Sequence, residues 1–78
     1  MVIGWEEIRT SEGEVIGLFL EEEIPRGLSP EETIARIRAQ GGLVLVPHPF
    51  DRWRRSTIRP DALGRIIAQV DIIVVFNA

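Results

Sequence analysis

The sequence predicts an α/β fold whose elements follow the order strand, strand, helix, strand, helix, strand. Three observations predict it: four apolar runs have the length of strands, a helix with clear start and stop signals lies between two of them, and a second amphipathic segment precedes the last run. Alternation of this kind is typical of parallel pairing through right-handed crossovers. We therefore expect the later strands to be parallel.

The first two strands are expected near residues 2–9 and 14–21. The runs VIGWEEIRT and EVIGLFLEE are rich in β-branched and aromatic residues. The letters SEG separate them, which indicates a hairpin or a tight corner. Both runs carry apolar residues on alternate faces, and this pattern is typical of a sheet covered on both sides.

The clearest local signal is SPEETIARIRAQGG, which predicts a helix over residues 30–40. Ser29 suits the N-cap, Pro30 the first helical position and Glu32 the reciprocal position of a capping box. Gly41 suits the left-handed residue that ends a helix. The sequence therefore contains a signal for the start of this helix and another for its end.

Both expected helices have one apolar face. In the first, Ile34 and Ile37 form the expected buried stripe. The second is expected over residues 60–69, because a proline suits its start and four apolar residues follow at the spacing of one helical face. These four are Leu63, Ile66, Ile67 and Val70.

Two buried strands complete the pattern. LVLVP predicts a strand over residues 43–47, and DIIVVFNA predicts one near 71–76. Pro47 and Pro49 remove two backbone donors, so the first of these strands cannot continue past them as a ladder. His48, the only histidine of the sequence, is therefore held at a strand end.

The composition excludes several classes of protein. The chain has 9 basic and 12 acidic residues, 45% hydrophobic residues and no cysteine. Disulfides and thiolate metal sites are therefore excluded, and the acidic balance makes nucleic acid a poor partner. No run approaches the roughly 20 apolar residues of a membrane span, and the N-terminus lacks the pattern of a signal peptide. We expect a cytoplasmic protein.

Three side chains are candidate metal ligands. His48 follows an expected parallel strand, at the end where ligands collect in α/β sheets, and imidazole is a common metal ligand. If the hairpin connection has an even number of residues, Glu7 and Glu14 are neighbours on one face, and a divalent cation would relieve their repulsion. The alternatives are a histidine that binds loop carbonyls, and a surface glutamate pair of which Arg9 neutralises one member.

Three stretches in a fixed order resemble the middle and later part of a PHP domain, the polymerase and histidinol phosphatase family of metal-dependent hydrolases. They are EEIRTSEGEVIGLFL, GLSPEETIARIRAQGGLVLVPHPFDRWR and DIIVVFNA. The most specific piece is GGLVLVPHPFDR. The resemblance covers almost the whole chain and implies that residues 1–78 form a single partial PHP-like domain.

This resemblance implies a partial (β/α)7 barrel of the PHP type, with two or three divalent metals, manganese, zinc or iron, at the carboxyl ends of its strands. Such metals activate a water for attack on a phosphoester. Glu7 matches the family's metal-bridging glutamate, His48 matches its histidine ligand in the HP pair, and Glu14 falls at a further ligand position.

The loop after His48 carries candidate substrate-binding residues for such an enzyme. Arg52, Arg54 and Arg55 are candidate phosphate contacts, because guanidinium groups pair well with phosphoryl oxygens. The alternative is a solvated loop whose arginines form surface ion pairs.

The sequence lacks the family's opening His-x-His and closing Asp-x-His motifs. Two functions therefore stay open. One is a fragment of a metal-dependent phosphoesterase, which we expect to be inactive as an isolated chain because three ligands cannot build a multinuclear site. The other is a non-catalytic, degenerate PHP module that binds a complementary barrel fragment or self-associates, since missing strands leave sheet edges unpaired.

Overall fold

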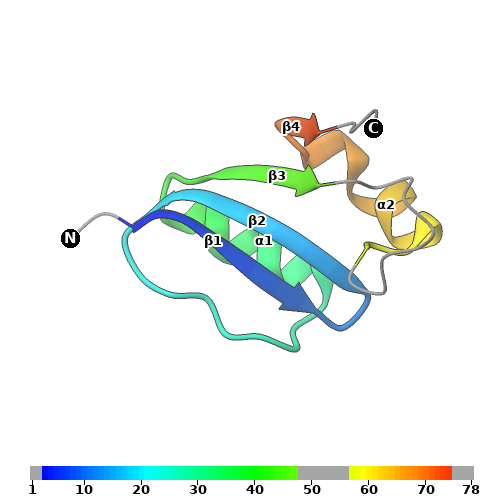
Figure 1. Ribbon diagram of the computed structural model, residues 1–78, viewed down its shortest axis with the longest axis horizontal. Helices are drawn as coiled ribbons and strands as arrows, with labels where there is room; N and C mark the ends of the chain where they lie inside the picture. Colours follow the sequence, from blue (N-terminus) through cyan, green and yellow to red (C-terminus); the bar gives the residue numbers. More distant parts are fainter. Residues whose placement is uncertain (1–2, 48–56, 75–78) are drawn as a thin grey trace.

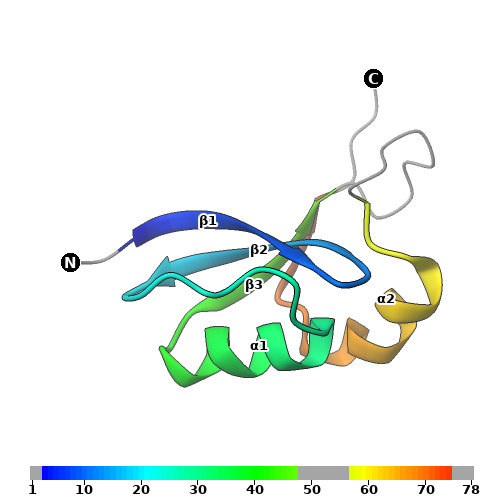
Figure 2. The ribbon, with the colours of Figure 1, turned by 90° about the horizontal axis from the view of Figure 1, so that it is seen from below.

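The computed structural model of the protein describes residues 3–47 and 57–74. Its strands β1 and β2 form a hairpin, and the helices lie together on one side of the sheet (Figures 1 and 2). In chain order the elements are β1 Ile3–Thr10, β2 Gly13–Leu20, α1 Pro30–Ala39, β3 Leu43–Pro47, α2 Pro60–Ile66, the 3-10 turn η1 Ile67–Gln69, and β4 Ile72–Val74.

The sheet has the strand order β1-β2-β3-β4 and is mixed. β1 pairs antiparallel with β2, and β2 pairs antiparallel with β3. β3 and β4 are parallel, as expected, with Leu45 opposite Ile72 and Val46 opposite Ile73. The order of strands and helices also matches the sequence prediction.

The predicted partial (β/α)7 barrel of the PHP type is wrong. A four-stranded mixed sheet with two short helices is too small for such a barrel, and β1 and β4 are its two edges. The physical reason is that a (β/α) barrel needs parallel neighbouring strands joined by helices. Here the chain passes from β2 through α1 to β3, and these two strands are antiparallel. Only the step from β3 through α2 to β4 joins parallel neighbours.

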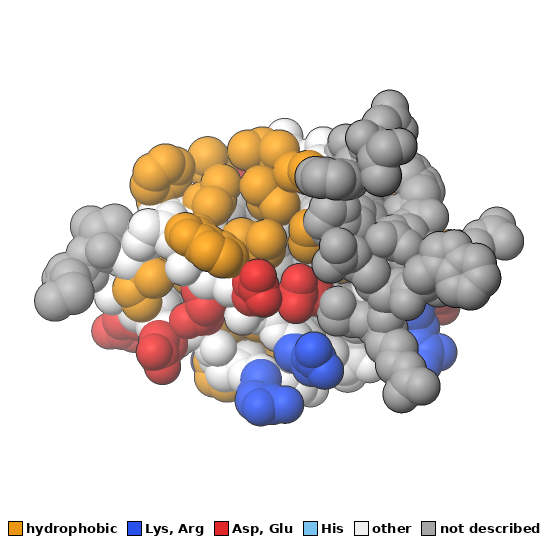
Figure 3. Space-filling view, viewed as in Figure 1, with side chains coloured by type: hydrophobic (Ala, Val, Ile, Leu, Met, Phe, Trp, Pro, Cys, Tyr) orange, Lys and Arg blue, Asp and Glu red, His pale blue; other side chains and the backbone are white. Residues whose placement is uncertain are grey.

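The expectation of a sheet covered on both sides is also wrong for the described residues. The described helices lie on one face, and the opposite face is the one seen in Figure 1. Apolar side chains gather on that uncovered face (Figure 3). Alternating apolar residues on both faces therefore do not indicate two helical layers in this chain.

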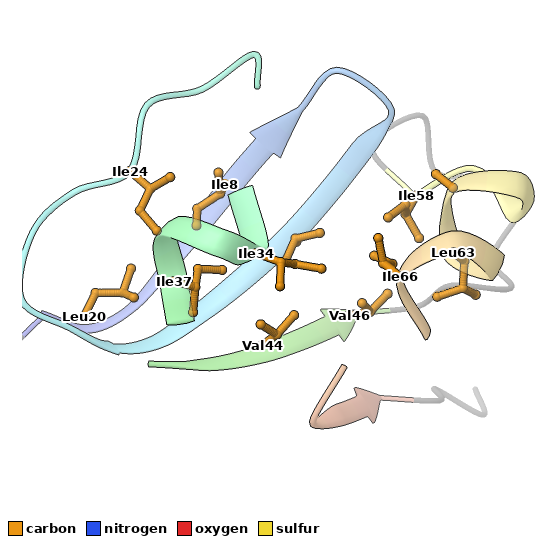
Figure 4. Close-up of a cluster of buried hydrophobic side chains, with 12 residues drawn as sticks. Ile8, Leu20, Ile24, Ile34, Ile37, Val44, Val46, Ile58, Leu63 and Ile66 are labelled. Atoms are coloured by element: carbon orange, nitrogen blue, oxygen red, sulfur yellow. The ribbon is translucent and has the colours of Figure 1, made fainter. Parts of the chain in front are cut away.

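The hydrophobic core fills the space between the sheet and the helices (Figure 4). Ile34 and Ile37 of α1 are fully buried, as predicted. They belong to one cluster with residues from β1, β2, β3, α2 and the segments before the two helices, which includes Ile8, Val15, Leu20, Ile24, Val44, Val46, Ile58, Ala62, Leu63 and Ile66. The two helices and the three longer strands thus share a single core.

The predicted start of the first helix is confirmed, and the helix ends at Ala39, one residue before the predicted end. The hydroxyl of Ser29 accepts a hydrogen bond from the backbone N–H of Glu32 at 3.1 Å. The carboxylate of Glu32 binds Arg36 at 3.2 Å, so it is used along the helix rather than for the reciprocal bond of a capping box. Gly41 has a φ of 76°, and its N–H donates to the carbonyl of Arg38.

The second helix is shorter than predicted. α2 ends at Ile66, and residues 67–69 form a 3-10 turn. Leu63 and Ile66 are buried, but Ile67 is 44% exposed because the tighter turn takes it off the buried face. The spacing that predicted one continuous helix over residues 60–69 therefore spans two different elements.

Candidate functional site

The hairpin places two of the predicted site residues on the same face of the sheet. A two-residue connection joins β1 to β2, and Arg9 lies opposite Glu14 while Glu7 lies opposite Ile16. Side chains alternate between the faces of a strand, so Glu7 and Glu14 both project from the face that the helices leave uncovered. The predicted hairpin register is confirmed.

Glu7 and Glu14 line one shallow depression together with Arg9 and Arg26, and its volume is about 430 Å³. Arg26 reaches this place because its loop runs along the edge of β1. The N–H of Gly27 donates to the carbonyl of Arg9 at 2.8 Å, and the N–H of Ser11 donates to the carbonyl of Leu28 at 2.7 Å. We call these four residues the acid–arginine depression.

The charges of the acid–arginine depression balance, because two carboxylates face two guanidinium groups. A strongly acidic site attracts a divalent cation by its unbalanced negative charge. The described residues of this depression fit the implied metal cluster only in part. They supply two carboxylate ligands beside two cations that repel a metal.

The remaining predicted site residues lie outside the described residues. They are the metal-ligand candidate His48 and the phosphate-contact candidates Arg52, Arg54 and Arg55. β3 ends at Pro47, directly before the histidine in the sequence. Among residues 3–47 and 57–74, no group of three or more His, Asp or Glu side chains is arranged to hold a metal ion.

An apolar surface lies next to the acid–arginine depression. It occupies the uncovered face of the sheet, which we call the open face (Figure 3). By strand register, the open face carries Trp5, Ile16, Leu18, Leu43, Leu45 and Ile72. Trp5 is 59% exposed and Ile72 is 39% exposed. Sequence reasoning missed this surface, because it treated alternate apolar residues as a sign of burial.

Ion pairs tie the hairpin turn to both helices on the opposite side. Arg65 of α2 binds Glu31 at the start of α1 at 2.8 Å, and it also binds Glu12 of the turn. The hydrogen bond from Arg65 lowers the pKa of Glu31, and the bonds to Glu31 and then Glu12 raise the pKa of Arg65. These contacts fix the turn against the helical layer.

A second tie joins β3, α1 and the start of β4. The carboxylate of Asp71 accepts a hydrogen bond from the N–H of Val44 at 2.8 Å and pairs with Arg38 at 3.0 Å. The N–H of Asp71 donates to the carbonyl of Val44 at 2.9 Å. The bond from Val44, followed by Arg38, lowers the pKa of Asp71. Asp71 thereby positions the short edge strand that carries Ile72.

Comparison with known proteins finds two similar uncharacterized proteins, both of Methanocaldococcus jannaschii. One is 52% identical over 80 residues, which cover all of this chain and 43% of that protein. The other is 46% identical over 76 residues, which cover 94% of this chain and 32% of that protein. The chain thus spans less than half the length of the curated relatives it matches.

No family model and no solved structure matches the chain. In the described part of the chain, neither helix has the length and apolar character needed to cross a membrane.

Proposed function

We propose that this chain is a non-catalytic interaction module that packs its open face against another polypeptide unit. The observation that carries the proposal is a sheet whose helices lie on one side while apolar side chains gather on the other. A contiguous apolar patch on the surface of a soluble protein is typical of an interaction site. The function is therefore association, with the sheet as the contact surface.

The residues of the open face suit an interface. Trp5 is an aromatic side chain of the kind that supplies much of the binding energy in protein contacts. It lies opposite Leu18 of β2, on the same face of the sheet. Covering the exposed parts of Trp5 and Ile72 contributes on the order of 1 kcal/mol each, and the other apolar residues of the open face, which are of intermediate burial, contribute less. Glu7, Arg9, Glu14 and Arg26 form a charged border beside the apolar part, as the polar rim of an interface does.

The partner we assign to the open face is the polypeptide that accompanies this unit in its longer relatives. In the 52% identical protein, the match covers 43% of the length, so more than half of that polypeptide is available to cover the face. The same holds for the 46% identical protein, of which 32% is matched. The contact is formed within one polypeptide or between separate ones, and its apolar chemistry is the same in both cases.

Co-expression tests this function. This chain would be produced together with the part of the 52% identical relative that lies outside the match, with an affinity tag on the relative's part. We expect the wild-type chain to be captured and Trp5→Glu and Leu45→Glu to be lost, because each places a charge in the apolar contact.

The matched control is Ile67→Glu, which changes an equally apolar, exposed side chain of η1 on the helical side. It should be captured like the wild type. Failure to capture the wild-type chain, or equal loss of all three variants, would contradict the proposal. In the absence of a partner, the same surface and the sheet edge at β4 support self-association.

A second candidate function is that of a PHP-family metal-dependent phosphoesterase of which this chain is one part. The observation that favours it is the placement of Glu7 and Glu14 on one face, lining one depression. They are the residues that match the family's ligand positions, together with His48. A divalent metal such as manganese, zinc or iron would supply Lewis-acid activation of water there. Arg52, Arg54 and Arg55 remain candidate contacts for the phosphoester.

Metal binding and turnover are tested separately. Calorimetric titration with manganese should show weak binding that Glu7→Gln and Glu14→Gln reduce further. The rate of hydrolysis of an aryl phosphate should not exceed the rate with the free metal. The chain lacks ligands that would position the attacking water, and losing that positioning raises the activation barrier by several kcal/mol. Turnover by the wild type that His48→Ala abolishes would favour the enzyme over the interaction module.

For either function, we propose a cytoplasmic location, which the lack of cysteine supports.

A further inference from the structure

A second hollow lies where the hairpin turn meets the segment before α2, and it shares only Arg9 with the acid–arginine depression. Its volume is about 210 Å³. The residues that matter for its chemistry are Arg9, Ser11 and Glu12 on the hairpin side and Thr57 and Arg59 on the other. We call this the turn hollow.

Backbone contacts build the turn hollow. The N–H of Arg59 donates to the carbonyl of Glu12 at 2.9 Å. Gly13 has a φ of 126°, and a Cβ there would lie 2.2 Å from the Cα of Ile58, so only glycine allows the two segments to come this close. Thr10 closes the turn, because its hydroxyl donates to the carbonyl of Gly13 and accepts from the N–H of Glu12. These contacts hold the hairpin turn and the segment before α2 together as the two sides of the hollow.

The charge of the turn hollow is positive. Among the described residues that line the hollow, the acidic one is Glu12. Its carboxylate is bound to Arg65, which lies outside the hollow. In the described part of the chain, neither Arg9 nor Arg59 has a side-chain ion pair. Two guanidinium groups without such partners and the hydroxyls of Ser11 and Thr57 therefore line the same hollow.

We propose that the turn hollow is an oxyanion site that binds a phosphate group through Arg9 and Arg59, with the two hydroxyls as further donors. Guanidinium groups match phosphoryl oxygens in geometry and charge, and hydrogen bonds between charged groups are the strong ones. A water molecule occupies about 30 Å³ in the liquid, so a hollow of about 210 Å³ has room for one phosphate group. This site shares Arg9 with the charged border of the open face, whereas Ser11, Glu12, Thr57 and Arg59 belong to the turn hollow and not to that border.

Titration of the ¹⁵N-labelled chain with inorganic phosphate, at ionic strength held constant with sodium chloride, tests the proposal. We expect saturable shifts of the backbone N–H signals of Ser11, Gly13 and Arg59. Arg59→Gln and Arg9→Gln should each weaken binding about tenfold, which corresponds to the loss of one charged hydrogen bond. Repeating the titration with phenyl phosphate distinguishes a site for phosphate esters from one for the free ion.

The control variant is Arg36→Gln, which removes an arginine paired with Glu32 on α1 and should leave phosphate binding unchanged. Urea unfolding of each variant checks that the fold is retained. Shifts that do not saturate, or that weaken equally in Arg36→Gln and Arg59→Gln, would identify an adventitious ion only and overturn the proposal. The double variant Arg9→Gln/Arg59→Gln should show no saturable binding.

Discussion

Gly13 is the residue on which the join between the hairpin turn and the segment before α2 depends. Its φ of 126° disfavours any side chain, and a Cβ would meet the backbone of Ile58. We predict that Gly13→Ala lowers the free energy of unfolding by about 2 kcal/mol or more, from backbone strain and the forced shift of Ile58. Urea unfolding measures this.

The control for that substitution is Gly64→Ala in α2. A Cβ at position 64 meets nothing within 4 Å. Alanine is a better helix former than glycine, so we expect the free energy of unfolding to rise by up to about 1 kcal/mol. A loss of stability at position 64 as large as at position 13 would show that the effect is not specific to the turn.

Asp71 gives the stability a defined dependence on pH. Its pKa in the folded chain lies below the ordinary value of 3.8, chiefly because the N–H of Val44 donates to it. The unfolded chain therefore binds a proton at higher pH than the folded chain does, and the stabilisation is present above the unfolded pKa and lost as pH falls through the folded pKa.

We predict that urea midpoints measured from about pH 6 to about pH 3 fall less steeply in Asp71→Asn than in the wild type. Arg38→Gln removes only the smaller cause of the shift, since the bond from Val44 remains, and should give an intermediate slope. Identical slopes in the wild type and Asp71→Asn would contradict this assignment.

The first helix is the element whose boundaries the sequence predicts best, because they depend on local bonds. Ser29 and Gly41 act through residues within four positions of themselves. We predict that Ser29→Ala lowers the free energy of unfolding by about 1 kcal/mol and that Ser29→Asp, which keeps an acceptor at the N-cap, stays near wild type. Thermal unfolding followed by circular dichroism measures both; equal destabilisation by the two variants would contradict the capping role.

The second helix shows where local patterns fail. Ile67 and Val70 continue the apolar spacing of Leu63 and Ile66, but α2 gives way to a 3-10 turn at position 67. The chain must turn here, because β4 lies parallel to β3 and Asp71 is bonded to Val44. Tertiary contacts of this kind override a periodicity that is read from neighbouring residues alone.

At the scale of the whole molecule, the sequence predicts the pairing of the hairpin but not the direction of the strand that follows. A two-residue connection fixes the register of β1 and β2, which places Glu7 and Glu14 on one face as expected. The barrel was implied by the resemblance to a PHP domain and is wrong, and no local signal in the sequence indicates that the chain returns through α1 to an antiparallel strand. The sequence also cannot distinguish an apolar strand face covered by a helix from one left uncovered, and the open face was missed for that reason.

Fluorescence of Trp5 tests most directly whether the open face is the contact surface. In a Trp53→Phe background, Trp5 is the only tryptophan of the chain, and its side chain is 59% exposed on that face. We predict that the part of the 52% identical relative outside the match shifts the emission of Trp5 to shorter wavelength and protects it from quenching by acrylamide. A complex that forms while the emission and quenching of Trp5 stay unchanged would contradict the account.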